Sequence, residues 1–334
     1  MIIKLQPGIN HTHHQHLLDA IGNKGFKVNE IKTQTSTYLV CIGNAEVDLR
    51  TFGHMPGISD IFHVSDEYKL VSRKWKTNFT QIDLGDNVVI GDGNLSILAG
   101  PCSIENEQQV LNTIQHLKDN NVKIMRGGVF KPRSSPYAFR GLGIDGLKMW
   151  YQLCKENGIK IITEVMQVSQ IADMYEYVDV FQVGARNTQN FNLLDELGKV
   201  DKPVMIKRGI SGTIEELLYS AEYVFSAGNE KILLCERGIR TYEKASRNTF
   251  DINAIPLLKD KTHLPVIADP SHGIGIREFV EPIALAAAVA GADGIIYETH
   301  EIPEKAASDG QQALNFAESA QLIRKLNSLS AIRD

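Results

Sequence analysis

Three cationic side chains lie within the eight residues 126–133, namely Arg126, Lys131 and Arg133, and Ser134 follows them directly. Cations at this density repel one another unless an anionic group lies between them. Guanidinium groups bind phosphate or carboxylate through paired hydrogen bonds, and lysines add a compact positive charge. The segment therefore predicts a site for a small phosphorylated or carboxylated molecule, although taken alone it is more typical of a solvated loop.

The cationic segment begins where a short apolar run, Val122–Met125, ends, and such a run is typical of a buried strand. From residue 95 onward, apolar runs of this kind alternate with amphipathic stretches. The expected strands are 95–99, 122–125, 160–163, 178–183, 204–206, 232–234, 266–268 and 294–297. The expected helices are 106–119, 142–157, 167–176, 190–199, 213–226, 250–259, 277–290 and 311–327.

Eight strand–helix pairs over residues 95–334 predict an α/β protein with a (β/α)8 TIM barrel. A doubly wound open sheet has the same alternation, but it predicts a glycine-rich phosphate loop after its first strand. The turn after the first strand reads Ala99-Gly-Pro-Cys102-Ser, which is not a dinucleotide-binding fingerprint. The barrel is therefore the favoured fold.

Residues 1–73 have a different pattern, with expected strands at 2–5, 26–32, 37–42 and 58–64 and expected helices at 11–22 and 45–54. This order, βαββαβ, predicts a small ferredoxin-like α+β domain. Residues 74–94 are expected to form a linker and a hairpin. The tract His11-Thr-His13-His14-Gln-His16 is interpreted as a solvated helix entry rather than a dedicated metal site.

Composition narrows the class of protein. The net charge of −5 argues against a general binder of nucleic acid or membrane surfaces. The four cysteines are scattered without C-x-x-C spacing, which is typical of a reducing compartment. No apolar run approaches the roughly 20 residues of a membrane span, and the first residues do not read as a secretory signal. We therefore expect a cytoplasmic protein that binds small molecules, with no nucleic acid and no membrane partner.

The barrel makes a further prediction, because functional side chains of this fold lie just after the C-terminal ends of the strands. Charged or polar residues follow every expected strand. The cationic ones are Arg126, Lys131, Arg133, Arg186, Lys207 and Arg237. The strand ends also carry Glu164, Arg208, Glu236 and Asp269. Six cations around one barrel mouth could bind several anionic groups.

A second set at the strand ends offers ligand atoms for a metal: Cys102, His272, Glu298 and Asp309. A thiolate, an imidazole and two carboxylates suit Mn, Fe, Co or Zn better than Mg. Taken singly, Cys102 is more typical of a buried core residue and His272 of an ordinary loop histidine. A nucleophilic Cys102–His272 pair is the rival chemistry, but it leaves the six cations without a role.

Seven motifs carry a resemblance to a known family. They read Ala99-Gly-Pro-Cys102-Ser, Met125-Arg-Gly-Gly-Val-Phe-Lys-Pro-Arg133, Gly184-Ala-Arg-Asn187, Lys207-Arg-Gly209, Cys235-Glu-Arg-Gly238, Asp269-Pro-Ser-His272 and Glu304-Lys-Ala-Ala-Ser-Asp-Gly310. Together they closely resemble type I 3-deoxy-D-arabino-heptulosonate 7-phosphate (DAHP) synthase, and the N-terminal segment resembles the regulatory module of the Iβ subgroup.

The resemblance implies a metal-dependent condensation of phosphoenolpyruvate with erythrose 4-phosphate, the entry step to the aromatic amino acids. It implies that the quartet Cys102, His272, Glu298 and Asp309 binds the metal. It places phosphoenolpyruvate at Arg186, Arg237, Arg126, Lys131 and Lys207, the aldose phosphate at Arg133 and Ser134, and further substrate contacts at Glu164 and Asp269. Lys131, Cys102 and His272 are the expected catalytic residues. By analogy, a homotetramer or homodimer and an aromatic effector, tyrosine or phenylalanine, are also expected.

Two alternatives stay open. 3-Deoxy-D-manno-octulosonate 8-phosphate (KDO8P) synthase shares the barrel and uses arabinose 5-phosphate, but the spacing Lys131-Pro-Arg133-Ser134 is of the DAHP synthase type. A catalytically silent barrel that senses phosphorylated metabolites would not need the metal quartet. The run after His272 departs from the family pattern, because Ile276 stands where an arginine is common.

Overall fold

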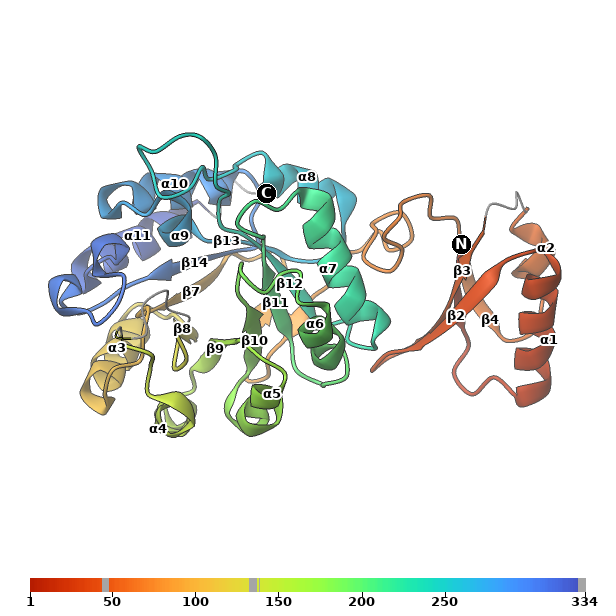
Figure 1. The fold of residues 1–334 in the computed structure, drawn as a ribbon, viewed down its shortest axis with the longest axis horizontal. Coiled ribbons are helices and arrows are strands. Elements are labelled where there is room, and N and C mark those ends of the chain that lie inside the picture. The colour runs from red at the N-terminus through yellow and green to blue at the C-terminus, as the bar shows by residue number, and fades with distance from the viewer. Residues whose placement is uncertain (44–47, 132–136, 138, 330–334) are drawn as a thin grey trace.

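The structure is a computed structural model that describes residues 1–43, 48–131, 137 and 139–329. A small sheet lies to one side of a closed barrel, and a connecting segment joins the two (Figure 1). None of the described helices is both long enough and apolar enough to cross a membrane.

The N-terminal sheet has four antiparallel strands in the order β2-β3-β1-β4. The strands are β1 (Ile2–Leu5), β2 (Lys27–Lys32), β3 (Thr37–Ile42) and β4 (Ile58–Phe62). The helices are α1 (His11–Asn23) and α2 (Arg50–Gly53), so the elements follow the expected order. α1 begins where the Asn10 side chain accepts a hydrogen bond from the His13 backbone N–H.

Alternate residues of the small sheet face two different cores, as the pleat requires. Ile3 and Leu39 pack with Leu17, Ile21 and Phe52 beneath the helices. Ile2, Tyr38 and Val40 face the other way and belong to the large core that includes the barrel. The small sheet therefore shares apolar packing with the barrel.

Aromatic rings form the junction between the sheet and the barrel. The Tyr38 ring lies 5.4 Å from the Trp75 ring and 6.1 Å from the Phe225 ring, both in edge-to-face geometry. The Trp75 ring in turn lies 5.6 Å from the ring of His263. Tyr38 comes from the small sheet, whereas Phe225 and His263 belong to the barrel domain.

Residues 64–80 connect the two parts and are hydrogen-bonded to the base of the barrel. The Glu222 carboxylate accepts the backbone N–H groups of Leu70 and Val71 at 2.9 and 3.0 Å. The Thr262 hydroxyl donates to the carbonyl of Val71, and His263 Nε2 lies 2.8 Å from the carbonyl of Leu70. We call residues 64–80 the strap.

Eight parallel strands close the barrel, which confirms the barrel rather than the open sheet. They are β7 (Ser96–Gly100), β8 (Ile124–Gly127), β9 (Lys160–Val165), β10 (Val180–Val183), β11 (Val204–Lys207), β12 (Ile232–Glu236), β13 (Val266–Ala268) and β14 (Gly294–Glu298). Closure is made by β14, whose residues Gly294 to Glu298 pair with Ser96 to Gly100 of β7.

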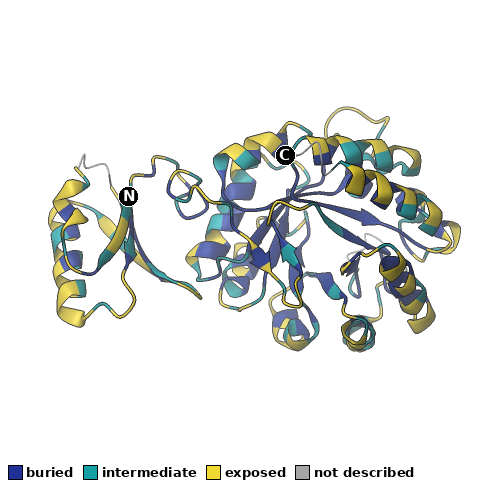
Figure 2. Cartoon of the chain, turned by 180° about the vertical axis from the view of Figure 1, so that it is seen from behind, coloured by how far each residue is buried: buried dark blue, intermediate teal, exposed yellow. Residues whose placement is uncertain are grey.

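The helices cover the outside of the barrel, with their buried faces inward and their exposed faces toward solvent (Figure 2). They are α3 (Glu107–Asp119), α4 (Gly143–Glu156), α5 (Ser169–Met174), α6 (Phe191–Leu197), α7 (Ile214–Ser226), α8 (Ala254–Lys261), α10 (Arg277–Val289) and α11 (Phe316–Ser328). Short helical turns add η1 (Tyr175–Tyr177), α9 (Pro270–Ile274), η2 (Pro303–Lys305) and η3 (Gly310–Gln312).

Several helices differ in extent from the expectation: α2 is Arg50–Gly53 rather than 45–54, and α8 begins at Ala254 rather than residue 250. Two further differences have a clear local cause. The last helix begins at Phe316 rather than residue 311, because Asn315 caps it through a reciprocal pair of hydrogen bonds with Glu318. The short helix α9 was not predicted. It forms because Pro270 suits a first helical turn and the Asp269 side chain accepts the His272 backbone N–H.

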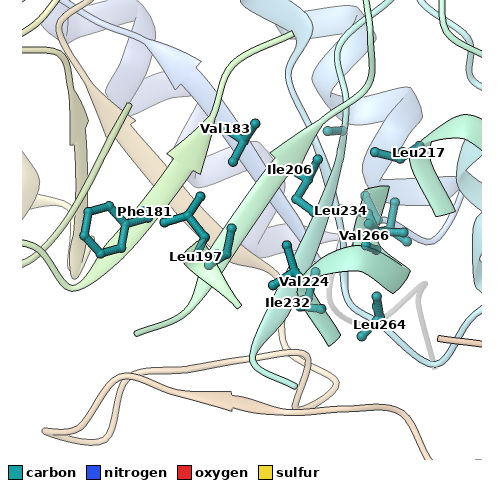
Figure 3. Packing of buried hydrophobic residues seen from close by; sticks show 14 of the residues in the cluster. Phe181, Val183, Leu197, Ile206, Leu217, Val224, Ile232, Leu234, Leu264 and Val266 are labelled. Atoms are coloured by element: carbon teal, nitrogen blue, oxygen red, sulfur yellow. The ribbon is translucent and has the colours of Figure 1, made fainter. Parts of the chain in front are cut away.

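The barrel strands alternate between two apolar layers. Residues such as Val183, Ile206 and Leu234 lie on successive strands beside side chains of α6 and α7 (Figure 3). The intervening residues fill the barrel interior, among them Leu98 and Ile162. The interior is closed at the N-terminal ends of the strands by a hairpin, β5 (Ile82–Asp83) and β6 (Val89–Ile90), whose apolar residues join this inner cluster.

Candidate active site

The four residues predicted to bind a metal lie together at the C-terminal ends of the strands. The ligand atoms of Cys102, Glu298 and Asp309 all lie within 4.8 Å of one another. His272 Nε2 lies 3.4 Å from Glu298 Oε1, so the imidazole faces the same point. Strand pairing explains the meeting, because Glu298 ends β14 in register with Gly100, two residues before Cys102.

His272 is held by its neighbours rather than by its own helix alone. Its Nδ1 lies 2.8 Å from Asp269 Oδ2, and Lys207 Nζ lies 2.5 Å from the same oxygen. Burial raises the pKa of Asp269, but His272 and Lys207 outweigh burial and hold that pKa well below its usual value. Burial lowers the pKa of His272, which favours a neutral ring whose Nε2 can ligate a metal.

The pKa values of both carboxylates of the quartet lie below their usual values, which favours the ionised form. Burial raises the pKa of Glu298, yet His272 and Arg126 outweigh it and the pKa is lowered. Burial is likewise outweighed at Asp309, where the hydrogen bond from Cys102 and the charge of Arg247 lower the pKa. Two carboxylates and an imidazole are ligand types that suit a divalent cation.

The Cys102 thiol completes the donor set. Burial and the charge of Glu298 raise its pKa to about 11, although Lys131, whose Nζ lies 3.1 Å from Sγ, opposes this. A thiol in this state is protonated at neutral pH, and a bound transition metal would displace the proton. One thiol, one imidazole and two carboxylates that converge within a few ångströms fit a divalent transition metal.

A cavity beside the quartet is lined by cations. Five of the six predicted ones face it: Arg126, Lys131, Arg186, Lys207 and Arg237. The sixth, Arg133, lies with Ser134 outside the described residues. Cys102, His272 and Asp309 line the same cavity, so the cationic set and the metal-type set share one site.

The cations differ in how far the protein already satisfies them. Arg126 donates to Glu298 Oε1 at 3.1 Å and to the carbonyl of Pro101 at 2.7 Å. Arg237 is buried, and with the described residues it makes one long hydrogen bond, 3.4 Å to the carbonyl of Gly238. Burial lowers the pKa of Arg237, although Asp269 opposes this. Within the described part of the chain, the Arg186 guanidinium has no hydrogen bond and no ion pair within 4.0 Å. Arg186 and Arg237 therefore have donors left for an anionic ligand.

Glu164 lies among these cations on β9. Burial raises its pKa, and Lys131, Lys207 and Arg186 oppose the rise. A Cβ at Gly184 would lie 1.9 Å from Glu164 Oε1, so only glycine leaves room for this carboxyl group. Close packing against Glu164 therefore explains why the motif begins with a glycine at position 184.

Of the described residues, four strand-end charges are not among those that line the cavity: Arg208, Glu236, Asp269 and Glu298. Asp269 and Glu298 contact His272, which does line it, whereas the other two lie elsewhere. Arg208 Nη1 lies 2.9 Å from both Glu236 Oε2 and Asp251 Oδ2, and Arg208 Nε donates to the carbonyl of Gly212. Successive side chains of a strand point to opposite faces, so Lys207 enters the cavity while Arg208 turns away. Arg208 and Glu236, which follow expected strands in the sequence, therefore pair with each other outside the cavity.

The sequence reading missed several lining residues. Arg240, Arg247 and Asn248 lie on the loop between β12 and α8, and Gln182 lies on β10. The two extra arginines within ten residues of Arg237 were a readable signal, since they extend the cationic pattern. Gln182 gave no such signal, because an uncharged residue inside a strand does not stand out.

The chain is similar to known proteins over most of its length. Residues 76–333 match the model of the DAHP synthetase I family. The chain is 43% identical over 331 residues to phospho-2-dehydro-3-deoxyheptonate aldolase of Thermotoga maritima, covering 99% of this chain and 98% of that protein. It is 31% identical over 272 residues to 2-dehydro-3-deoxyphosphooctonate aldolase of Geobacter sulfurreducens, covering 75% of this chain and 98% of that protein.

Two solved structures are also similar. The crystal structure of the Thermotoga maritima DAHP synthase superposes with a TM-score of 0.79 at 42% identity, covering 99% of this chain and 97% of the other. A truncated form of the Thermotoga maritima enzyme gives a TM-score of 0.74 at 44% identity, covering 79% of this chain and 97% of the other.

Proposed function

The chain belongs to the DAHP synthetase I family, and on this premise we propose that it condenses phosphoenolpyruvate with erythrose 4-phosphate and water. The products are DAHP and phosphate, in the first step of the shikimate pathway. The observation that carries the proposal is that a cationic cavity and a Cys-His-Glu-Asp donor set meet at one barrel mouth. An anionic enol phosphate and an aldehyde that must be made electrophilic require these two features.

Phosphoenolpyruvate carries a phosphate and a carboxylate, and the cations divide between them. Arg186 and Arg237 would bind the phosphate, because their donors are the least used by the protein. Arg126, Lys131 and Lys207 would bind the carboxylate. Lys207 keeps two further N–H groups beyond its contact with Asp269.

Cys102, His272, Glu298 and Asp309 would hold the divalent metal, with Mn, Fe, Co and Zn as the candidates. When bound, the metal supplies Lewis-acid polarisation of the aldehyde carbonyl. Asp269 fixes the His272 ring, and Arg126 restrains Glu298, so the protein keeps these donors in place before substrate arrives.

Lys131 is proposed as the proton donor to the new hydroxyl group. Its ammonium lies 3.1 Å from Cys102 Sγ, at the boundary between the donor set and the cationic cavity. Attack by carbon 3 of phosphoenolpyruvate on the aldehyde leaves an oxygen there that must take up a proton. We expect Lys131→Met to lower kcat by roughly 10²–10⁴-fold, the range for general acid catalysis. Normal turnover of this variant in a stopped assay of DAHP formation would refute the proposed role of Lys131 as proton donor.

Arg133 and Ser134 are proposed to hold the phosphate of the aldose, and the second candidate function depends on the aldose. Relatives at 31% identity are named 2-dehydro-3-deoxyphosphooctonate aldolases, which supports KDO8P synthase activity only distantly. The test is an assay with phosphoenolpyruvate plus either erythrose 4-phosphate or arabinose 5-phosphate. We expect turnover with the four-carbon aldose, its loss in EDTA and its recovery with Mn²⁺. Preference for the five-carbon aldose would favour KDO8P synthase, and absence of any product would favour a sensor.

We propose residues 1–73 as a ferredoxin-like regulatory domain, 74–94 as linker and hairpin, and 95–334 as the catalytic barrel. The strand order β2-β3-β1-β4 with antiparallel neighbours supports the ferredoxin-like plan. The proposed effector is tyrosine or phenylalanine, and the proposed assembly is a homodimer or homotetramer.

Deletion of residues 1–63 tests the regulatory role while it keeps the strap, whose Leu70 and Val71 are bonded to Glu222. We expect the truncated enzyme to keep its turnover and to lose inhibition by tyrosine or phenylalanine. Equal inhibition of both forms would refute the role, and gel filtration of each form would show whether the deleted residues also hold the oligomer together.

A further inference from the structure

Gln312 is a completely buried amide beside the donor set, and both ends of its side chain are used. Its Nε2 donates to Glu298 Oε2 at 2.6 Å, and its Oε1 accepts a hydrogen bond from Arg247 Nη1. A buried amide with both ends bonded has one orientation, because rotation by 180° would place like groups together. Gln312 is therefore a rigid link between Arg247 and Glu298.

The two carboxylate oxygens of Glu298 have different partners. Oε2 is occupied by Gln312, whereas Oε1 lies 3.1 Å from Arg126 Nη1 and 3.4 Å from His272 Nε2. Glu298 has no exposed surface, so water cannot replace a lost donor without rearrangement. The orientation of the carboxylate plane thus depends on Gln312 on one side and Arg126 on the other.

Arg247 reaches a second donor of the set. The same Nη1 that binds Gln312 lies 3.6 Å from Asp309 Oδ1. A Cβ at Gly275, whose φ is +69°, would lie 2.4 Å from the Cβ of Arg247, so the glycine lets the arginine pack closely over α9. Arg247 therefore connects the loop after β12 with the loop that carries Asp309.

The backbone of the same loop also supports His272. Arg247 N–H donates to the carbonyl of Ile274 at 3.0 Å, and Asn248 N–H donates to that of Gly273 at 3.1 Å. The Asn248 side chain donates to the carbonyl of His272 itself at 2.8 Å. One loop thus touches the surroundings of three of the four proposed ligands.

We propose that Gln312 is a positioning residue that sets the orientation of Glu298 toward the metal, and that Arg247 holds Gln312 in place. The inference rests on the proposed metal centre and deepens it. Hydrogen-bond partners behind metal ligands typically contribute about 10–100-fold to metal affinity. An amide suits this task because it donates to the carboxylate and cannot be ionised.

The experiment measures Mn²⁺ binding to the metal-stripped, full-length protein by isothermal titration calorimetry, with the EPR spectrum of the bound ion as a second readout. Gln312→Met keeps the length of the side chain and removes both hydrogen bonds. Its matched control is Gln311→Met, because Gln311 is the adjacent glutamine and is exposed. We expect Mn²⁺ to bind about 10–100-fold more weakly to Gln312→Met, with an altered EPR spectrum, and unchanged binding to Gln311→Met.

Arg247→Met gives an independent arm, since its side chain is 35% exposed and its replacement does not open a sealed core. We expect weaker Mn²⁺ binding here too, and a double variant with Gln312→Met that binds only slightly more weakly than Gln312→Met alone. If Gln312→Met fails to fold, Arg247→Met decides the matter by the same measurement.

Wild-type Mn²⁺ affinity in either Gln312→Met or Arg247→Met overturns the inference, even if the melting temperature falls, because a merely structural role would change stability alone. A wild-type protein that binds no divalent metal would instead overturn the metal centre of the proposed function, and the positioning role with it.

Discussion

The two ends of the barrel are built from the same eight strands and differ in almost every chemical respect. At the N-terminal ends, Ile82, Val88 and Ile90 of the hairpin close an apolar interior. At the C-terminal ends, cations and carboxylates surround a cavity, and Arg237 is buried with a single weak hydrogen bond to the described residues. The comparison teaches that one end stabilises the fold, whereas the other keeps unsatisfied charge ready for a ligand at a cost in stability.

Ion pairing also distinguishes the arginines at the C-terminal ends of the strands from one another. Arg208 is neutralised by Glu236 and Asp251 and lies outside the cavity. Arg186 and Arg237 line the cavity and are left without such partners among the described residues. A charged residue after a strand therefore marks the end of the barrel where the site lies. The lack of an ion-pair partner among the described residues then marks the arginines that are free to bind a ligand.

The largest expected effect is a loss of activity when a cation of the cavity at the C-terminal ends of the strands is removed. Arg237→Met removes a buried guanidinium that would otherwise bind the phosphate of phosphoenolpyruvate, and loss of such a buried charge contact costs about 4 kcal/mol, or about 10³-fold in kcat/KM. The melting temperature should stay the same or rise, because a buried and poorly satisfied charge disappears. A variant with near-normal kcat/KM, or with a clearly lower melting temperature, would contradict the proposal that this end of the barrel holds unsatisfied charge for a ligand.

A smaller effect, on stability rather than on activity, is expected at the N-terminal ends of the strands. Ile90→Ala creates a cavity in the inner cluster and should lower the free energy of unfolding by about 3 kcal/mol. Because the site lies at the other end of the strands, kcat at 25 °C should remain close to that of the wild type. Urea unfolding and steady-state kinetics on the same preparation measure both quantities, and a large fall in kcat would show that the ends are coupled.

The smallest expected effect concerns pH and sharpens the contrast. Burial lowers the pKa of His263, at the base, to about 3. The unfolded chain takes up this proton near pH 6.5, so the stability is complete above that pH and is lost as the pH falls from about 6.5 toward 3. At pH 5 the loss is about 2 kcal/mol relative to pH 7.

The carboxylates at the C-terminal ends of the strands should respond at lower pH, whereas His272, whose pKa burial also lowers, contributes to the loss between pH 7 and 5. The carboxylates of Asp269, Glu298 and Asp309 have lowered pKa values, so their contribution is lost only below about pH 4. Unfolding free energies of the wild type and His263→Gln, compared between pH 7 and 5, isolate the contribution of His263. An equal loss in both proteins would show that His263 is not the source of the first acid effect.

Much of the fold follows from apolar periodicity. The strand expected at 266–268 is found at Val266–Ala268, and the other barrel strands overlap their expected ranges. The barrel fixes the strand ends on one rim, which is why Cys102 and Glu298, distant in sequence, could be paired in advance.

The limits of the sequence reading have local causes. A strand does not reveal whether a charge such as Arg208 faces the cavity or the helix layer until its register is known. Helix α9 escaped because five residues with a proline read as a turn, and its formation depends on a side-chain cap from Asp269. Gln312 escaped because its importance lies in its two partners, which come from other segments.

The position of Trp75 among the rings of Tyr38, Phe62 and His263 gives the molecule an internal optical reporter. The only other indole, Trp150, is buried on α4 with its Nε1 directed at Met125 of β8. In a Trp150→Phe protein, emission would come from the ring cluster alone. Its wavelength and quenching would then register any swing of the small sheet against the barrel as an effector is titrated.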